Sequence, residues 1–166
     1  MPKLLVLFAG AERSAALADA VARGARAVRF TEVDLHRAAD RGPDKQSPEP
    51  AAAKSRAADA YETLTEYDAL VLVGDESGAS ALAAFVGEKQ PLTDLVGAVV
   101  AADGVPEDST QALAAALGRR GMILISGSDD PESVGRRAAK VAGWVRHAKG
   151  HEHGHTHTHE HPHSHH

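Results

Sequence analysis

The chain has 166 residues, a formal net charge of −5 with neutral histidine, and no cysteine. One domain is the usual organisation at this length, and the lack of cysteine excludes disulfides, thiolate catalysis and cysteine-ligated metal clusters. The acidic balance disfavours a nucleic-acid partner, because binding to phosphates needs a basic face. No apolar run is long enough to span a membrane, and no signal peptide is recognisable, so we expect a cytoplasmic protein.

The first 24 residues predict a buried strand that leads directly into a helix. Residues 4–8 form an unbroken apolar run, which is typical of a strand covered by helices on both faces. Gly10 interrupts this run, and apolar and small residues then recur at helical spacing over residues 15–24. The turn between them aims the end of the strand and the start of the helix at one point, where free N–H groups favour an anion.

Residues 27–35 mix apolar and charged side chains, which indicates a strand with one wet face at the edge of a sheet. Residues 37–60 follow, with three prolines in the first half and an alanine-rich second half. Proline opposes a helix in the first half, whereas the second half suits a short helix. We interpret this stretch as a loose crossover within one domain.

The rest of the chain alternates between buried strands and helices. The expected strands are residues 67–74, 97–101 and 122–126. The expected helices are residues 79–86, capped by Ser77 or Ser80, residues 109–118, with Gly118 as a stop, and a final helix that begins at Asp130-Pro131-Glu132. The final helix carries one apolar stripe: Val134, Ala138, Val141 and Val145. We expect the fold to end at Gly150.

Five alternations of strand and helix predict a parallel sheet with right-handed crossovers. The first, third and fourth strands are wholly apolar and suit the centre, whereas the mixed second strand suits an edge. The order 2-1-3-4-5 satisfies both conditions. This is a flavodoxin-like α/β sandwich, with its ligand crevice at the switch between strands 1 and 3. We expect this domain over residues 1–148 and a disordered tail over 149–166.

Four stretches of the sequence resemble those of a known family: residues 3–8, 20–25, 64–74 and 117–125. They are similar to the flavodoxin-like NAD(P)H:quinone oxidoreductases of the tryptophan-repressor-binding-protein type, and more loosely to the NADPH-dependent FMN reductases. The resemblance implies an FMN-dependent NAD(P)H oxidoreductase that passes hydride through flavin to a quinone-like acceptor. It is also compatible with a homo-oligomer.

In such families three loops hold FMN, and the resemblance implies their counterparts here at residues 9–14, 74–79 and 101–106. Arg13 is suited to pair with a phosphate, and Ser14 to donate a hydrogen bond from the helix start. The residues implied to bind the cofactor are Gly10, Arg13, Ser14, Gly74, Ser77, Gly78, Asp103 and Gly104.

These three loops also differ from the family pattern. They lack most of the hydroxyl groups and bring no aromatic wall for the flavin ring, and they carry four acids: Glu12, Asp75, Glu76 and Asp103. Converging carboxylates disfavour an anionic cofactor. These differences favour an alternative function, a non-catalytic flavodoxin-like scaffold that has lost FMN. The acids would suit a cation such as Mg²⁺, although acids near helix starts are mostly caps.

The C-terminal segment 151–166 holds nine of the 11 histidines, spaced mainly as His-x-His. Such a segment cannot bury a core and is expected to be disordered without metal. Imidazole suits Ni²⁺, Zn²⁺, Co²⁺ and Cu²⁺, and the varied spacer residues favour a natural segment over a purification tag. The candidate metal ligands are His151, His153, His155, His157, His159, His161, His163, His165 and His166. In the alternative function, this tail sequesters or delivers nickel, zinc or cobalt.

Overall fold

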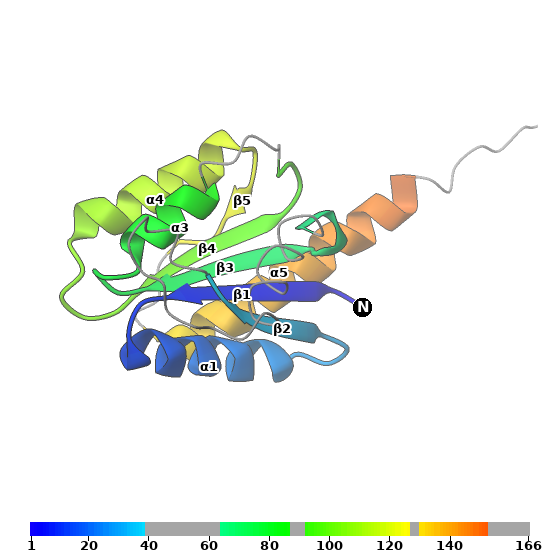
Figure 1. Ribbon diagram of the computed structural model, residues 1–166. Helices are drawn as coiled ribbons and strands as arrows, with labels where there is room; N and C mark the ends of the chain where they lie inside the picture. The colour runs from blue at the N-terminus through cyan, green and yellow to red at the C-terminus, as the bar shows by residue number, and fades with distance from the viewer. Residues whose placement is uncertain (39–63, 87–91, 127–129, 153–166) are drawn as a thin grey trace, which may run out of the picture.

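The computed structural model shows one five-stranded parallel sheet covered by helices on both faces (Figure 1). It describes residues 1–38, 64–86, 92–126 and 130–152. Of residues 151 and 152 it describes only the backbone. The strands are β1 (Lys3–Ala9), β2 (Glu32–Arg37), β3 (Ala69–Gly74), β4 (Val96–Ala101) and β5 (Ile123–Leu124). Their order is β2-β1-β3-β4-β5, so the predicted flavodoxin-like order is confirmed.

Four α-helices cover this sheet in the described part of the chain: α1 (Glu12–Arg26), α3 (Ala79–Val86), α4 (Glu107–Arg119) and α5 (Pro131–Glu152). A short 3-10 helix, η1 (Leu64–Glu66), precedes β3. Beyond Ala38, the expected crossover over residues 37–60 lies outside the described residues.

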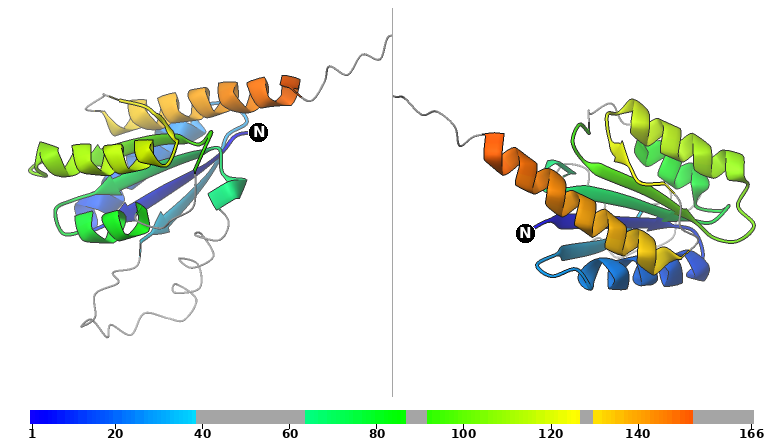
Figure 2. Two further views of the ribbon diagram at one scale, coloured as in Figure 1. Left: turned by 90° about the horizontal axis from the view of Figure 1, so that it is seen from above. Right: turned by 180° about the vertical axis from the view of Figure 1, so that it is seen from behind.

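The apolar runs are explained by a core on each side of the sheet. Leu5 and Leu7 of β1 pack with the core under α3 and α4. Leu4 and Val6 point to the other face and pack with the core under α1 and α5. Figure 2 shows the two helical layers from above and from behind. Because successive side chains of a strand alternate between faces, a strand buried on both sides has to be apolar throughout.

Two of the expected strands, β2 and β5, have clearly different bounds in the structure. β2 begins at Glu32 and not at residue 27, because the chain turns first through Phe30, which has a positive φ of 60° and is 73% exposed. β5 comprises only Ile123 and Leu124, which pair with Val96 and Gly97, so the predicted strand over residues 122–126 is too long. Nevertheless, β2 lies at a sheet edge, as its mixed composition predicts.

The ends of two helices also differ from expectation. α4 begins at Glu107 and ends at Arg119, and the left-handed residue that follows it is Gly121, with φ 87°. Gly118 is therefore inside the helix and does not stop it. α5 continues through Gly150 to Glu152, two residues beyond the expected end of the fold.

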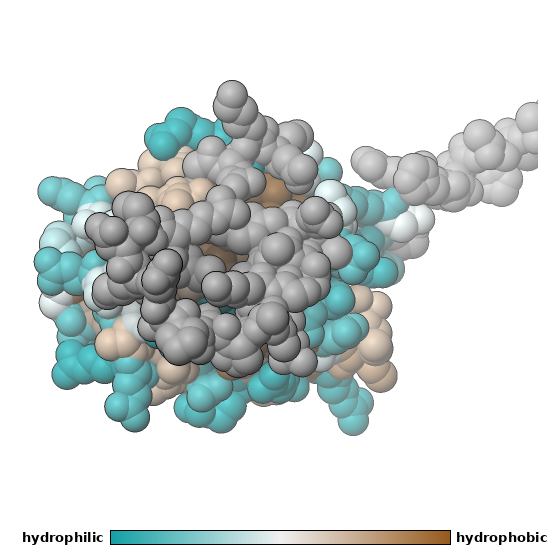
Figure 3. Space-filling model, in the orientation of Figure 1, coloured by the Kyte–Doolittle hydropathy of each residue, from teal (hydrophilic) through white to brown (hydrophobic). Residues whose placement is uncertain are grey.

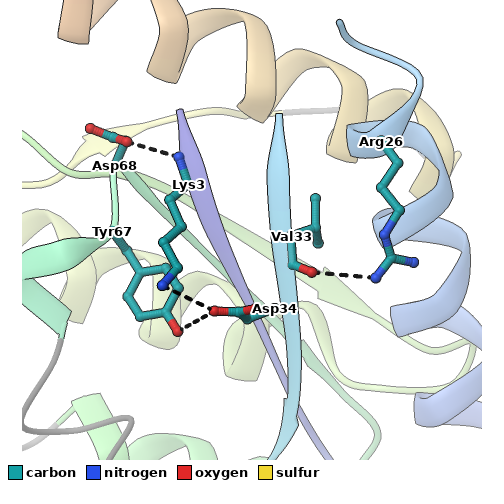
Figure 4. A network of polar contacts seen from close by, with 6 residues as sticks. All are labelled: Lys3, Arg26, Val33, Asp34, Tyr67 and Asp68. Atoms are coloured by element: carbon teal, nitrogen blue, oxygen red, sulfur yellow. Dashed lines mark hydrogen bonds and ion pairs between the residues drawn. The ribbon is translucent and has the colours of Figure 1, made fainter. Parts of the chain in front are cut away.

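A polar network ties the edge strand to the sheet at the N-terminal ends of the strands (Figure 4). The Tyr67 hydroxyl donates a hydrogen bond of 2.7 Å to Asp34 of β2, and the Lys3 ammonium lies 3.4 Å from the same carboxylate oxygen. Burial, assisted by this hydrogen bond, raises the pKa of Tyr67 well above its usual value, so the phenol stays protonated. Arg146 of α5 pairs with Asp68 at 3.0 Å. This end of the sheet is therefore fixed by structural contacts, away from the expected ligand crevice.

Candidate functional site

The loops that follow β1, β3 and β4 meet around a cavity of about 500 Å³. It lies at the C-terminal ends of the strands, where an open parallel sheet places its ligand crevice. The lining residues are Arg13, Asp75, Glu76, Ser77, Ala102, Asp103, Gly104 and Val105. The structure thus brings together four of the expected cofactor residues, Arg13, Ser77, Asp103 and Gly104, in one cavity.

The Asp75 side chain reaches from the end of β3 to the loop that follows β1. Its Oδ2 accepts a hydrogen bond of 2.8 Å from the backbone N–H of Ala11. Its Oδ1 accepts hydrogen bonds from the Ser77 hydroxyl at 2.6 Å and from the Gly78 N–H at 3.0 Å. The Ser77 hydrogen bond is the largest cause that lowers the pKa of Asp75 to about 2, so this carboxylate is ionised at neutral pH.

Three of the expected cofactor glycines serve the packing of these loops. Gly10 has φ 115°, and a Cβ there would lie 2.1 Å from Oδ1 of Asp75. A Cβ on Gly78 would lie 2.1 Å from the Ala9 carbonyl oxygen, and one on Gly74 would lie 2.6 Å from the Leu82 side chain. Because Gly10 and Gly78 have no side chain, the loops after β1 and β3 can approach each other closely. Gly74 likewise allows close packing of β3 against α3.

Arg13 and Ser14 stand next to each other at the start of α1 but differ in environment. Arg13 is exposed and makes no hydrogen bond or ion pair with any described residue. Ser14 is fully buried, and its hydroxyl has no hydrogen-bond partner of good geometry within the described ranges. It lies close enough to the Asp75 carboxylate to help lower its pKa.

Asp75 is the functional residue that the sequence reasoning misjudged. Its position directly after a buried strand marked it only as an acid that repels an anionic cofactor. In the structure it holds the starts of two helices together. Neither Ser77 nor Ser80 caps α3 among the described residues: the Ser77 hydroxyl donates to Asp75, and Ser80 makes no side-chain hydrogen bond with them. Asp75 lies four residues before the first residue of α3, outside the position of an N-cap, so the usual capping pattern does not mark it.

A second, larger cavity of about 810 Å³ lies beside the first and shares Arg13, Ala102 and Asp103 with it. It opens where β5 stops, since β5 pairs only with the first two residues of β4. Its walls combine apolar side chains such as Val99 and Val134 with the guanidinium group of Arg137, which donates a hydrogen bond of 3.0 Å to the Ser126 carbonyl.

The residues at the three loops do not fit the phosphate of FMN. The backbone N–H groups of Ala11 and Gly78 already bind the protein's own carboxylate. Among the described residues, the smaller cavity brings three carboxylates, those of Asp75, Glu76 and Asp103, against one guanidinium group, and none of the side chains that line either cavity is aromatic. FMN would therefore meet repulsion at its phosphate and no stacking partner at its ring.

No cluster of three or more metal-ligating side chains exists among the described residues. The described residues of the acidic loops therefore form no such cluster for Mg²⁺. Except for His151, whose backbone forms part of the last turn of α5, the candidate tail ligands lie outside the described residues. Within the same part of the chain, no helix is both long and apolar enough to cross a membrane. Figure 3 shows hydrophilic and apolar residues interspersed around the rim of one face.

The low pKa of Asp75 predicts that its contribution to stability depends on pH. A carboxyl group whose pKa falls on folding stabilises the protein above its unfolded pKa of about 3.9. That contribution is lost as the pH falls towards its folded pKa of about 2. We expect the wild type to exceed Asp75→Asn in stability at neutral pH and the difference to shrink between about pH 4 and 2. The urea denaturation midpoints of both proteins, measured across this pH range, give the difference in stability. A difference that stays constant with pH would contradict the prediction.

Comparisons with known proteins concern the fold. No protein-family model matches the sequence, and no curated protein matches it. The solved structures of three flavodoxins are similar. One is a short-chain flavodoxin associated with a non-canonical PDU bacterial microcompartment, with 15% identity, a TM-score of 0.57, and 89% of this chain and 99% of that chain covered.

A flavodoxin from the domain Archaea matches with 16% identity and a TM-score of 0.56, over 87% of this chain and 99% of that one. Oxidised Flavodoxin 2 from Bacillus cereus matches with 15% identity and a TM-score of 0.54, over 88% and 99%. Together with the sheet order and the helical layers, these matches show that the chain has a flavodoxin-like fold.

Proposed function

We propose that this chain is a non-catalytic flavodoxin-like scaffold that works without FMN and binds divalent nickel, zinc or cobalt through its histidine-rich tail. The observation that carries the first part is the acidic character of the cavity at the strand ends. In the part of the chain that the structure describes, Asp75, Glu76 and Asp103 line it together with one basic residue, Arg13.

The size of the electrostatic effect supports this choice. Two like charges 4 Å apart repel by about 4 kcal/mol at the effective dielectric constant of a protein surface. A phosphate monoester carries between one and two negative charges at neutral pH, and Arg13 can offset one carboxylate at most. Flavin affinity would then depend on ring stacking, and the described residues that line the two cavities include no aromatic side chain.

The second part rests on the chemistry of the tail sequence. Alternating His-x-His lets neighbouring imidazoles of an extended segment reach one ion, and nine histidines offer more donors than one ion needs. Histidines that alternate along one low-complexity segment make an open, exchanging site, which suits storage or delivery better than a catalytic metal with a tuned water molecule.

FMN titration of the full chain tests the first part. We expect no saturable quenching of flavin fluorescence up to about 1 mM FMN, where a binding free energy would be only about 4 kcal/mol. Riboflavin, which lacks the phosphate, is the control for ring binding. Saturable quenching at micromolar FMN, weakened by Arg13→Ala, would contradict the proposal. It would support instead the FMN-dependent NAD(P)H oxidoreductase with a quinone-like acceptor that the sequence resemblance implies.

A further inference from the structure

We propose that the carboxylate of Asp75 takes the place of a bound phosphate. It links the starts of α1 and α3 and so fills an anion site, and this site becomes open to a ligand when the Asp75 side chain is removed. This inference deepens the proposed function and rests on it, because it names the residue whose carboxylate satisfies the helix starts in a protein that works without FMN. The ligand class of the reopened site is a tetrahedral oxyanion, as in inorganic phosphate or a phosphate monoester.

The first argument is the position of the carboxylate between two helix starts. Ala11 immediately precedes α1, and its side chain cannot cap that helix. Gly78 immediately precedes α3. Both residues donate their backbone N–H to Asp75, one to each oxygen. Helix starts carry partial positive charge and bind anions, so one carboxylate satisfies two sites that would otherwise attract a ligand's anion.

The second argument is an unused donor beside the carboxylate. Ser14 is fully buried on the first turn of α1, and its hydroxyl makes no hydrogen bond of good geometry in the described part of the chain. It is one of the groups that lower the pKa of Asp75, so the hydroxyl lies beside that carboxylate although the geometry is not that of a hydrogen bond. A buried hydroxyl without a partner is unfavourable. A carboxylate has two oxygens and a phosphate at least three, so Ser14 is the donor expected for the oxygen that Asp75 lacks.

The third argument is space. The carboxylate lies where a side chain on Gly10 would be, since a Cβ there would come within 2.1 Å to 2.6 Å of all three carboxyl atoms of Asp75. Removal of the Asp75 side chain would therefore leave a gap bordered by the N–H groups of Ala11 and Gly78. An anion that enters this gap would meet the same donors that now hold the carboxylate.

The test is rescue of stability by an anion. We expect Asp75→Gly and Asp75→Ser to unfold at lower temperature than the wild type. Inorganic phosphate at about ten times its dissociation constant should then raise their unfolding temperature by about 3 °C over sodium chloride of the same ionic strength. Asp75→Asn fills the same volume without charge, so it should be destabilised but not rescued. Ser14→Ala added to Asp75→Ser should weaken the rescue.

The outcomes separate this inference from the proposed function. Equal loss of stability in phosphate and in chloride would show that Asp75 is only a helix cap, and an equal phosphate effect on the wild type would place the anion elsewhere; both would overturn the inference. Rescue by FMN at a lower concentration than phosphate would assign the site to a nucleotide-like monoester, and equal rescue would assign it to free phosphate; both support an anion site. The wild-type FMN titration judges the proposed function independently.

Discussion

Replacing Gly135 with alanine is expected to destabilise the protein by about 3 kcal/mol, the upper part of the usual range for overpacking a tight contact. A Cβ at this position would lie 2.0 Å from the carbonyl oxygen of Val21. That atom belongs to the backbone of α1 and cannot rotate away as a flexible side chain would. The unfolding temperature should therefore fall by about 6 to 12 °C, at about 2 to 4 °C per kcal/mol for a chain of this size.

The reason is the close approach of α1 and α5, which lie side by side on one face of the sheet (Figure 2). Each helix offers a glycine to the backbone of the other. Gly24 of α1 faces the Glu132 carbonyl, where a Cβ would come within 1.9 Å, just as Gly135 of α5 faces Val21. Alanine at either position has to push the helices apart. Because α1 also carries Arg13 and Ser14 at its start, such a shift would be transmitted to the candidate site.

Gly143→Ala is the matched control, since this glycine lies in the same helix as Gly135. A Cβ there would meet only the ring of Pro2 at 4.0 Å, an ordinary contact. Alanine is favoured over glycine inside a helix by about 1 kcal/mol, so this variant should be more stable than the wild type. Urea denaturation followed by far-UV circular dichroism compares the two variants. Similar effects at both positions would show that α1 and α5 do not approach so closely.

The sheet and its order could be predicted because burial on both faces leaves a direct mark in the sequence. Val71 and Leu72 of β3 face opposite cores, and both must be apolar. The length of β5 could not be predicted in this way. Ile123 and Leu124 are each 42% exposed, yet they are as apolar as any buried pair. The length of an edge strand depends on how far its backbone stays hydrogen-bonded to the neighbouring strand, and amino-acid composition does not indicate this.

The candidate site could be predicted in its location but not in its contacts. Parallel topology alone brings the loops after β1, β3 and β4 to one edge of the sheet. Whether Asp75 points outward or towards Ala11, 64 residues away in the chain, depends on side-chain rotation and on the clearance at Gly10. A sequence pattern contains neither quantity. The close approach of Gly78 to the Ala9 carbonyl is of the same kind, since no sequence pattern marks it.

The second large effect is expected in metal binding by the full chain. Replacing the nine tail histidines with asparagine should weaken Ni²⁺ and Zn²⁺ binding by about 100-fold or more, since imidazole is the donor that these ions prefer among the side chains of the segment. His36 and His147 stay in both proteins. In the described residues no cluster of three or more ligating side chains can replace the tail. Isothermal titration calorimetry at about pH 7.5 measures the difference between the two proteins.

The same titration at lower pH tests whether imidazole is the ligand. Binding by the wild type should weaken as the pH falls through about 6.5, because protonated imidazole cannot coordinate a metal. The asparagine variant should show no such step, and its unfolding temperature without metal should equal that of the wild type, because both cores of the described part of the chain lie within residues 4–145. Equal metal affinity in the two proteins would place the site elsewhere and remove the metal part of the proposed function. Loss of metal binding with an unchanged fold would show that the tail holds the metal and that the flavodoxin-like domain serves as the scaffold that carries the tail.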